Sequence, residues 1–152
     1  MTAKDYLQEI QRWDMFIEQK HYEYQTLKKD VNHLRAVDYS RVHTTPTSTS
    51  AGFTNCSDRK LDIELELKRD MQLFNTMRHE RIQEIQRMDR ESYAVLLFKR
   101  YVEYKTIACI AVEMNKDPKY MSKLHQDALK AFEHQYAEKL EKANMSWLQM
   151  AS

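Results

Sequence analysis

A cluster of polar side chains between residues 116 and 130 has the chemistry needed to contact double-stranded DNA. Lysine reaches guanine edges and glutamine reaches adenine edges, so Lys123 and Gln126 are candidate base readers. Lysines also bind phosphates, which position a protein on the duplex without reading its sequence. The candidate DNA-binding residues are Lys116, Lys119, Tyr120, Ser122, Lys123, Gln126 and Lys130. The plainer alternative is a solvated helix face with ordinary lysines.

These side chains fall on one face of a helix that is predicted to begin at Pro118. Proline suits the first helical position because its missing N–H has no intrahelical partner there, and Asp117 is a favourable N-cap. Apolar residues recur on the opposite face at three- and four-residue steps, so that face is predicted to be buried. They are Met121, Leu124, Ala128 and Phe132.

A shorter helix precedes this one. Thr106 can cap it, and Asn115-Lys116 can form the following turn, because asparagine tolerates positive φ better than most residues. Its inward positions are Ile107, Ile110, Ala111 and Met114. Two short helices joined by a tight turn, the second opening with exposed polar and basic residues, predict a helix-turn-helix.

Residues 100–132 resemble region 4 of bacterial sigma factors, and the chain resembles more closely the small phage transcriptional regulators of the ArpU/RinA type. The residues that match the family pattern are Arg100-Tyr101, Thr106, Ile110-Ala111, His125, Ala128 and Leu129. Three positions depart from the pattern. Tyr104 stands at the usual Gly of the first turn, Ala108-Cys109 at the usual acidic first turn, and Asp117 at the usual Ser cap. Asp117 brings a negative charge near the expected phosphate.

The resemblance implies a phage-encoded transcriptional regulator that activates late genes by binding promoter DNA and contacting host RNA polymerase, in the cytoplasm of the bacterial host cell. Only the last third of the chain carries specific motifs. Two alternatives stay open. Small terminase subunits of phages also join a helix-turn-helix to helical oligomerisation segments, and a helical interaction protein would bind protein instead of DNA.

Composition predicts an all-α protein. The chain has 152 residues, a single Gly, two Pro and 31% charged residues, which leaves little material for tight β turns. The net charge is only +1, so DNA binding has to come from a local patch. Because residues 99–143 carry nine Lys or Arg and seven Asp or Glu, monomer affinity is expected to be modest. A dimer or a polymerase partner would compensate.

Two long helices are predicted before the helix-turn-helix. The first runs to about residue 34, with Thr2 and Asp5 as a capping box and two series spaced by seven: Ile10, Ile17, Tyr24 and Val31, and Tyr6, Trp13, Lys20, Leu27 and Leu34. The second runs from residues 57–58 to 88, with Arg78 and Arg81 interrupting its apolar seam. They form an antiparallel hairpin within one chain, or the same seams pair between chains.

The local composition of the sequence also indicates how the chain is divided into a linker and two domains. Ser, Thr, the single Gly52 and Pro46 cluster in residues 36–57, which are predicted to form a flexible linker. We therefore expect two domains: a hairpin or coiled coil over residues 1–88 with this linker inside it, and a helix-turn-helix domain over residues 89–152.

The helix-turn-helix is expected to have a helix on either side. The preceding helix, 90–102, would be capped by Asp89 and would direct Tyr93, Leu96, Leu97 and Tyr101 inward. After Phe132 the helical pattern continues. Its apolar residues are expected to fold back on the body: Tyr136, Leu140, Met145, Trp147, Leu148 and Met150.

Other classes of function lack support. No glycine-rich phosphate loop or Gly-x-Ser-x-Gly motif is present, so we expect no enzyme and no cofactor. The six histidines lack metal-ligand spacing, and His125 is interpreted as a packed or hydrogen-bonded structural residue. Cys56 and Cys109 do not form a disulfide framework. The absence of a secretory signal and of a long apolar run predicts a cytoplasmic protein without a membrane span.

Overall fold

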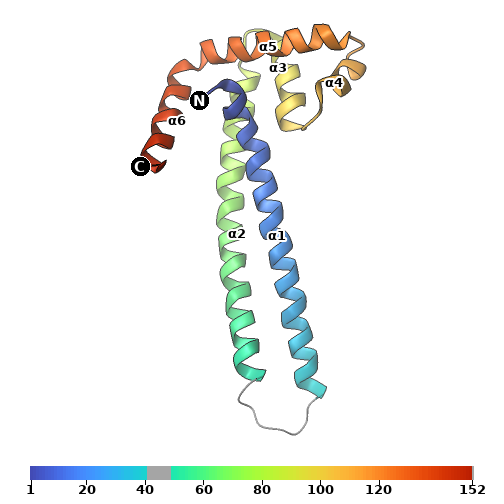
Figure 1. The fold of residues 1–152 in the computed structure, drawn as a ribbon, viewed down its shortest axis with the longest axis vertical. Helices are drawn as coiled ribbons and strands as arrows, with labels where there is room; N and C mark the ends of the chain where they lie inside the picture. The colour runs from blue at the N-terminus through green and yellow to red at the C-terminus, as the bar shows by residue number, and fades with distance from the viewer. Residues whose placement is uncertain (41–48, 152) are drawn as a thin grey trace. The chain divides into compact units, whose positions relative to one another are not determined.

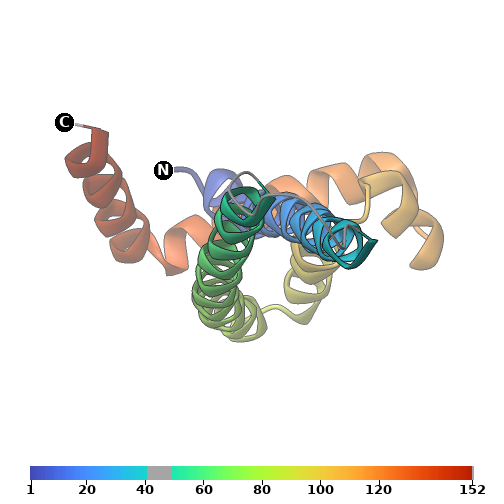
Figure 2. The same ribbon diagram turned by 90° about the horizontal axis from the view of Figure 1, so that it is seen from below.

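The computed structural model describes residues 1–40 and 49–151, and this part of the chain is helical (Figure 1). The elements are α1 (Ala3–Ser40), α2 (Thr49–Gln86), α3 (Glu91–Leu97), the π-helical turn η1 (Phe98–Val102), α4 (Ile107–Glu113), α5 (Pro118–Gln135) and α6 (Ala137–Ala151). The two long helices α1 and α2 pack as a hairpin and lie side by side in both ribbon views (Figures 1 and 2). The predicted all-α fold, with a helical hairpin before shorter C-terminal helices, is confirmed.

The long helices extend into the predicted linker. Residues 36–40 belong to α1 and residues 49–57 belong to α2, so the prediction of a linker over 36–57 is wrong for these positions. The remaining residues, 41–48, lie outside the described part of the chain. Ser and Thr disfavour helix only weakly, a single Gly costs about 1 kcal/mol, and each residue added to an existing helix gains one further hydrogen bond. Local composition therefore underestimated both helix lengths.

The chain divides into two compact units at other places than residue 88. One unit comprises Met1–Trp13 together with Asn75–Ser152, and the other comprises Asp14–Phe74. Long-range contacts explain why the start of α1 belongs with the C-terminal helices. The backbone N–H of Ala3 donates to Glu133 Oε1 at 3.0 Å, and the rings of Tyr6 and Phe132 lie 6.1 Å apart.

The capping box at the start of α1 is confirmed. Thr2 Oγ1 accepts a hydrogen bond from the Asp5 backbone N–H at 3.2 Å and donates one to Asp5 Oδ2 at 2.7 Å. The hydrogen bond from Thr2 is the main cause of a lowered pKa of the Asp5 carboxyl. One orphan backbone donor, the Asp5 N–H, and the Thr2 hydroxyl are thus satisfied at the helix start.

The unit of residues 14–74 is a two-helix hairpin with a narrow apolar seam. Among its described side chains, the buried apolar ones are Ile17, Leu27, Val31, Leu67 and Phe74. Lys20, at a heptad position, forms ion pairs with Glu66 and Asp70 of the facing helix. The lysine that interrupts the apolar pattern therefore has carboxylate partners across the hairpin.

Three short helices form the core of the other unit. Buried residues of α3, α4 and α5 meet in one cluster, with Tyr93, Ile107 and Met114 packed against it: Leu96, Ile110, Ala111, Met121 and Leu124. These are inward positions that the sequence predicted. The predicted cap Asp89 is wrong by one residue, because α3 begins at Glu91 and its N-cap Arg90 makes no side-chain cap hydrogen bond.

The C-terminal tail folds back less than expected. The helix breaks at Tyr136, and α6 then buries Leu140, which is 6% exposed. Met145 and Leu148 are 68% and 66% exposed, so the fold-back prediction is wrong for them. The side chains of Trp147 and Met150 lie outside the described residues.

Among the described residues, no helix combines the length and the apolar character that a membrane span requires.

Candidate nucleic-acid interface

The turn between α4 and α5 has the geometry that the sequence predicts. Asn115 adopts φ of 52°, and the Lys116 N–H donates to the Ala111 carbonyl at 2.9 Å, which closes the end of α4. Asp117 Oδ1 then accepts from the Lys119 N–H at 3.3 Å, with Pro118 in the first turn of α5. Each step is local, because it depends on the backbone preferences of single residues.

The start of α4 is also fixed by its residues. Thr106 Oγ1 accepts from the Cys109 N–H at 3.2 Å, which confirms it as the N-cap. Before it, Tyr104 adopts φ of 59°. A residue with a Cβ in this left-handed region costs roughly 1 kcal/mol or more, which is why glycine is favoured there. The chain therefore adopts a glycine-like conformation at the position where the resembled family has Gly.

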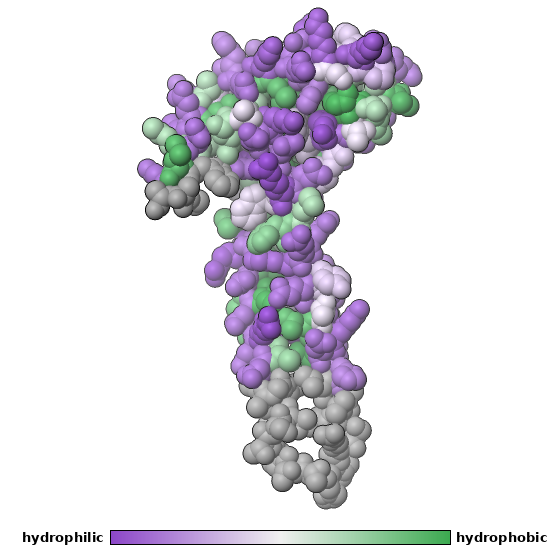
Figure 3. Space-filling view, in the orientation of Figure 1, coloured by the Kyte–Doolittle hydropathy of each residue, from purple (hydrophilic) through white to green (hydrophobic). Residues whose placement is uncertain are grey.

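The buried and the exposed residues of α5 lie on different faces of the helix. Met121, Leu124, Ala128 and Phe132 are buried. All seven candidate DNA-binding residues are exposed, with Tyr120 at 53%. Figure 3 shows a largely hydrophilic surface over α5. The structure thus brings the candidate residues together on α5 and, through Lys116, on the turn that leads into it.

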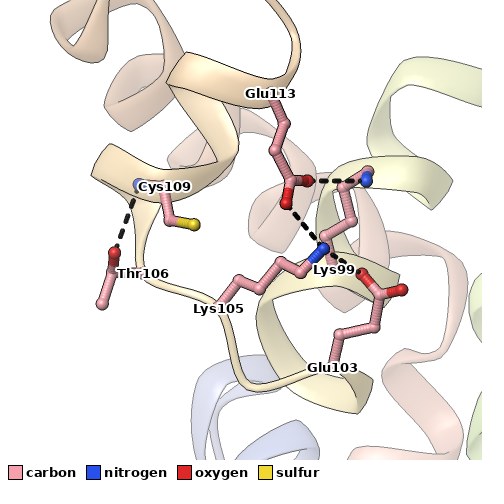
Figure 4. A network of polar contacts seen from close by, with 6 residues as sticks. All are labelled: Lys99, Glu103, Lys105, Thr106, Cys109 and Glu113. Atoms are coloured by element: carbon pink, nitrogen blue, oxygen red, sulfur yellow. Dashed lines mark hydrogen bonds and ion pairs between the residues drawn. The ribbon is translucent and has the colours of Figure 1, made fainter.

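A polar network joins η1, the turn after it and α4 (Figure 4). Glu113 accepts from Lys99 Nζ at 2.8 Å and from Lys105 Nζ at 2.7 Å, and Glu103 lies 3.3 Å from Lys105. Hydrogen bonding to Glu113 raises the pKa of Lys105, and hydrogen bonding to the two lysines lowers the pKa of Glu113. Two lysines beside the helix-turn-helix are therefore paired with carboxylates.

His125 is a structural residue, as predicted. The Tyr101 hydroxyl and His125 Nε2 form a hydrogen bond of 2.8 Å, with Tyr101 buried and His125 half-buried. Burial, and then the positive charges of Arg100 and Lys4, lower the pKa of His125. Burial raises the pKa of Tyr101 to about 12. A neutral imidazole that accepts from Tyr101 fits both shifts.

Sequence reasoning missed a second polar network in the same unit. Arg81 is 8% exposed. Its Nη1 donates to the Tyr6 carbonyl at 2.6 Å and to Glu9 Oε2 at 2.7 Å. Glu84 accepts from the Tyr6 hydroxyl at 3.0 Å and pairs with Lys139 at 2.6 Å. This network anchors the start of α1 to α2 and α6.

Metal-binding side chains are not clustered in the described part of the chain. No group of three or more His, Cys, Asp or Glu side chains there is arranged to hold a metal ion. Cys56 and Cys109 are free thiols.

Comparison with known proteins gives no match to any family model, curated protein or solved structure.

Proposed function

We propose that the chain is a DNA-binding transcriptional regulator that reads the major groove with the first turns of α5. The observation that carries the proposal is the outer face of α5. It presents Lys123 and Gln126, both exposed, at the end of a correctly capped turn. In a helix-turn-helix this part of the second helix enters the major groove. Lys123 would donate to guanine and Gln126 would form a paired contact with adenine.

The lysines of this face are available for phosphate. Lys99 and Lys105 are held by Glu113, but within the described residues Lys116, Lys119 and Lys130 have no ion-pair partner and are exposed. Contacts between these lysines and phosphates would release counterions from the DNA, so their contribution to the affinity would decrease as the salt concentration rises. The carboxylate of Asp117 accepts a hydrogen bond from the Lys119 N–H, so part of its negative charge is compensated by the helix cap.

The biological role in this proposal comes from the resemblance to phage regulators of the ArpU/RinA type. It comprises activation of late genes and contact with RNA polymerase in the cytoplasm of the bacterial host. The left-handed backbone at Tyr104, where the family has Gly, supports the alignment of the motif. The small net charge of the chain, +1, makes a polymerase contact or a second copy useful for promoter affinity.

Self-association through the long helices is part of the proposal. Among the described side chains of residues 14–74, the large apolar ones that are exposed outnumber the buried ones. The exposed ones are Met15, Phe16, Tyr22, Leu61, Leu65, Met71 and Leu73. A second copy would cover part of this surface, and a dimer would double the number of DNA contacts. Sedimentation equilibrium tests this directly: a dimer supports the proposal, and a ring-sized oligomer favours a small terminase subunit.

DNA binding itself is tested with the full chain. Selection from a random duplex library, followed by fluorescence anisotropy on the enriched sequence at several salt concentrations, measures both affinity and specificity. We expect one enriched motif that is bound far more tightly than scrambled DNA, with affinity that falls steeply with salt. No enrichment and equally weak binding to every duplex would favour the helical interaction protein instead.

A further inference from the structure

The basic side of α5 continues beyond the turns that a helix-turn-helix inserts into the groove. Its exposed basic side chains follow one another at steps of four, seven and four residues: Lys119, Lys123, Lys130 and His134. α5 has 18 residues and is therefore about 27 Å long, whereas the major groove is about 12 Å wide. When the start of α5 lies in the groove, its C-terminal half lies near the phosphate backbone.

A surface pocket of about 440 Å³ opens at this C-terminal half, between α5 and the residues that lead into α3. Both belong to the same compact unit. The polar side chains that line the pocket are Asp89, Arg90, Tyr93, His134 and Gln135. The Gln135 amide donates to the Arg87 carbonyl at 3.1 Å, and Arg90 and His134 supply the basic groups of the lining.

The guanidinium of Arg90 is positioned by Tyr93 and has donors that can bind an anion. Its Nη1 donates to the Tyr93 hydroxyl at 3.0 Å, and its guanidinium carbon lies 5.1 Å from the centre of the Tyr93 ring. This contact restrains the side chain and leaves other N–H groups of the fork unused. No carboxylate in the described residues forms an ion pair with Arg90, in contrast to Arg59 and Arg81. A planar fork with free donors matches two phosphate oxygens.

One charge in the pocket opposes an anion. Asp89 is exposed and also lines the pocket. Its repulsion lowers affinity for an isolated anion, so the pocket is suited to a phosphate that neighbouring contacts along α5 already hold in place.

We propose that this pocket, the Arg90 pocket, binds a DNA backbone phosphate next to the base pairs read by Lys123 and Gln126. The inference rests on the proposed DNA-binding function and extends its footprint from the turn and first turns of α5 to the residue before α3. Arg90 positions the duplex and does not read bases, so it adds affinity equally to all sequences.

Arg90→Gln in the full chain tests the pocket. We expect weaker binding to the selected and to the scrambled duplex by the same factor, with their ratio unchanged. The slope of log affinity against log salt should fall by roughly 0.9, the value for one lost phosphate contact. Arg90→Lys should restore the slope, since the charge returns without the fork. Asp89→Asn should tighten binding.

Two controls make the result specific. Arg59→Gln removes the same charge from the hairpin unit, where the Arg59 side chain is 70% exposed, and should leave the slope unchanged. Single methylphosphonate substitutions along the selected duplex should locate one flanking phosphate that matters for the wild type and not for Arg90→Gln.

The outcomes separate the two proposals. If the wild type selects and binds a motif but Arg90→Gln has the same salt slope, the Arg90 pocket is refuted and the DNA-binding function stands. An equal loss in Arg59→Gln refutes the pocket in the same way, because it indicates a general charge effect. If the wild type binds no duplex, the proposed function itself fails.

Discussion

The hydroxyl of Tyr101 and Nε2 of His125 lie 2.8 Å apart, which joins η1 to the middle of α5. The two residues stand at motif positions of the resembled family, yet neither faces the outer surface of α5. Their hydrogen bond holds η1, which precedes α4, against α5, the helix proposed to read DNA. We therefore expect the pair to affect the proposed DNA binding only through the orientation of α5.

The stability of the protein should depend on pH through His125. Its pKa is lowered in the folded chain from an ordinary value of 6.5, so the unfolded chain binds the proton first as the pH falls. The free energy of unfolding should be constant above this value and decrease as the pH drops below it. Thermal melts between pH 5 and 8 measure the effect. His125→Gln should flatten the curve, and an unchanged slope in this variant would contradict the assignment.

The double substitution of Lys123→Ala and Gln126→Ala should remove sequence preference without unfolding the protein. Both side chains are exposed, so the melting temperature should stay within a few degrees. The loss of two base contacts should cost roughly 1–3 kcal/mol of discrimination for each. Anisotropy on selected and scrambled duplexes measures the ratio. A large drop in melting temperature would show that these residues belong to the core face.

Leu124→Asp should unfold the helix-turn-helix core. Leu124 is 9% exposed and packs in the cluster formed by α3, α4 and α5, so the substitution buries a carboxylate without a partner. Leu124→Ala is the milder variant and should cost about 2–5 kcal/mol of unfolding free energy. Circular dichroism during thermal melting checks both, and a Leu124→Asp protein with wild-type stability would overturn the core assignment.

Asn115 should tolerate glycine but not alanine. Its φ of 52° lies in the left-handed region, where alanine costs about 1 kcal/mol or more and glycine has no Cβ clash. We expect Asn115→Ala to be destabilised by about that amount, with Asn115→Gly close to the wild type. Urea denaturation resolves the difference. Equal stability of the two variants would contradict the left-handed turn.

Arg81→Ala should destabilise the unit that contains the helix-turn-helix. Loss of the guanidinium removes the ion pair with Glu9 and the hydrogen bond to the Tyr6 carbonyl, and breaking a buried pair costs about 3–5 kcal/mol. The matched control is Arg59→Ala, whose ion pair with Glu23 is exposed and 3.8 Å long. We expect less than about 1 kcal/mol there. Equal effects in urea denaturation would argue against a structural role for Arg81.

The helix-turn-helix could be predicted from sequence because its signals are local. Thr106, Asn115 and Asp117 each fix the backbone within a few residues of themselves, and all three act as expected. The periodic apolar face of α5 then placed the candidate site residues on the exposed side. No tertiary information was needed for either step.

Other features could not be predicted because they depend on contacts between distant residues. Arg81 looked like an interruption of an apolar seam, and its partners Tyr6 and Glu9 lie more than seventy positions earlier in the chain. The Arg90 pocket combines residues of α5 with the segment before α3, and no spacing rule connects them. Contacts between distant residues also divide the chain into compact units that differ from the expected domains, since residues 1–13 join the later unit.

The position of residues 1–13 has a consequence for how the protein is made. A ribosome releases Ala3 long before Glu133, its hydrogen-bond partner 130 positions later. The unit that contains the helix-turn-helix can therefore close only after Glu133 has been synthesised, when a long loop is brought together. Loop closure costs entropy that grows slowly with length, and pairing of α1 with α2 shortens the loop that remains, because it brings the start of α1 close to the end of α2. A truncated chain ending before α5 would leave the start of α1 without its native contacts to Phe132 and Glu133.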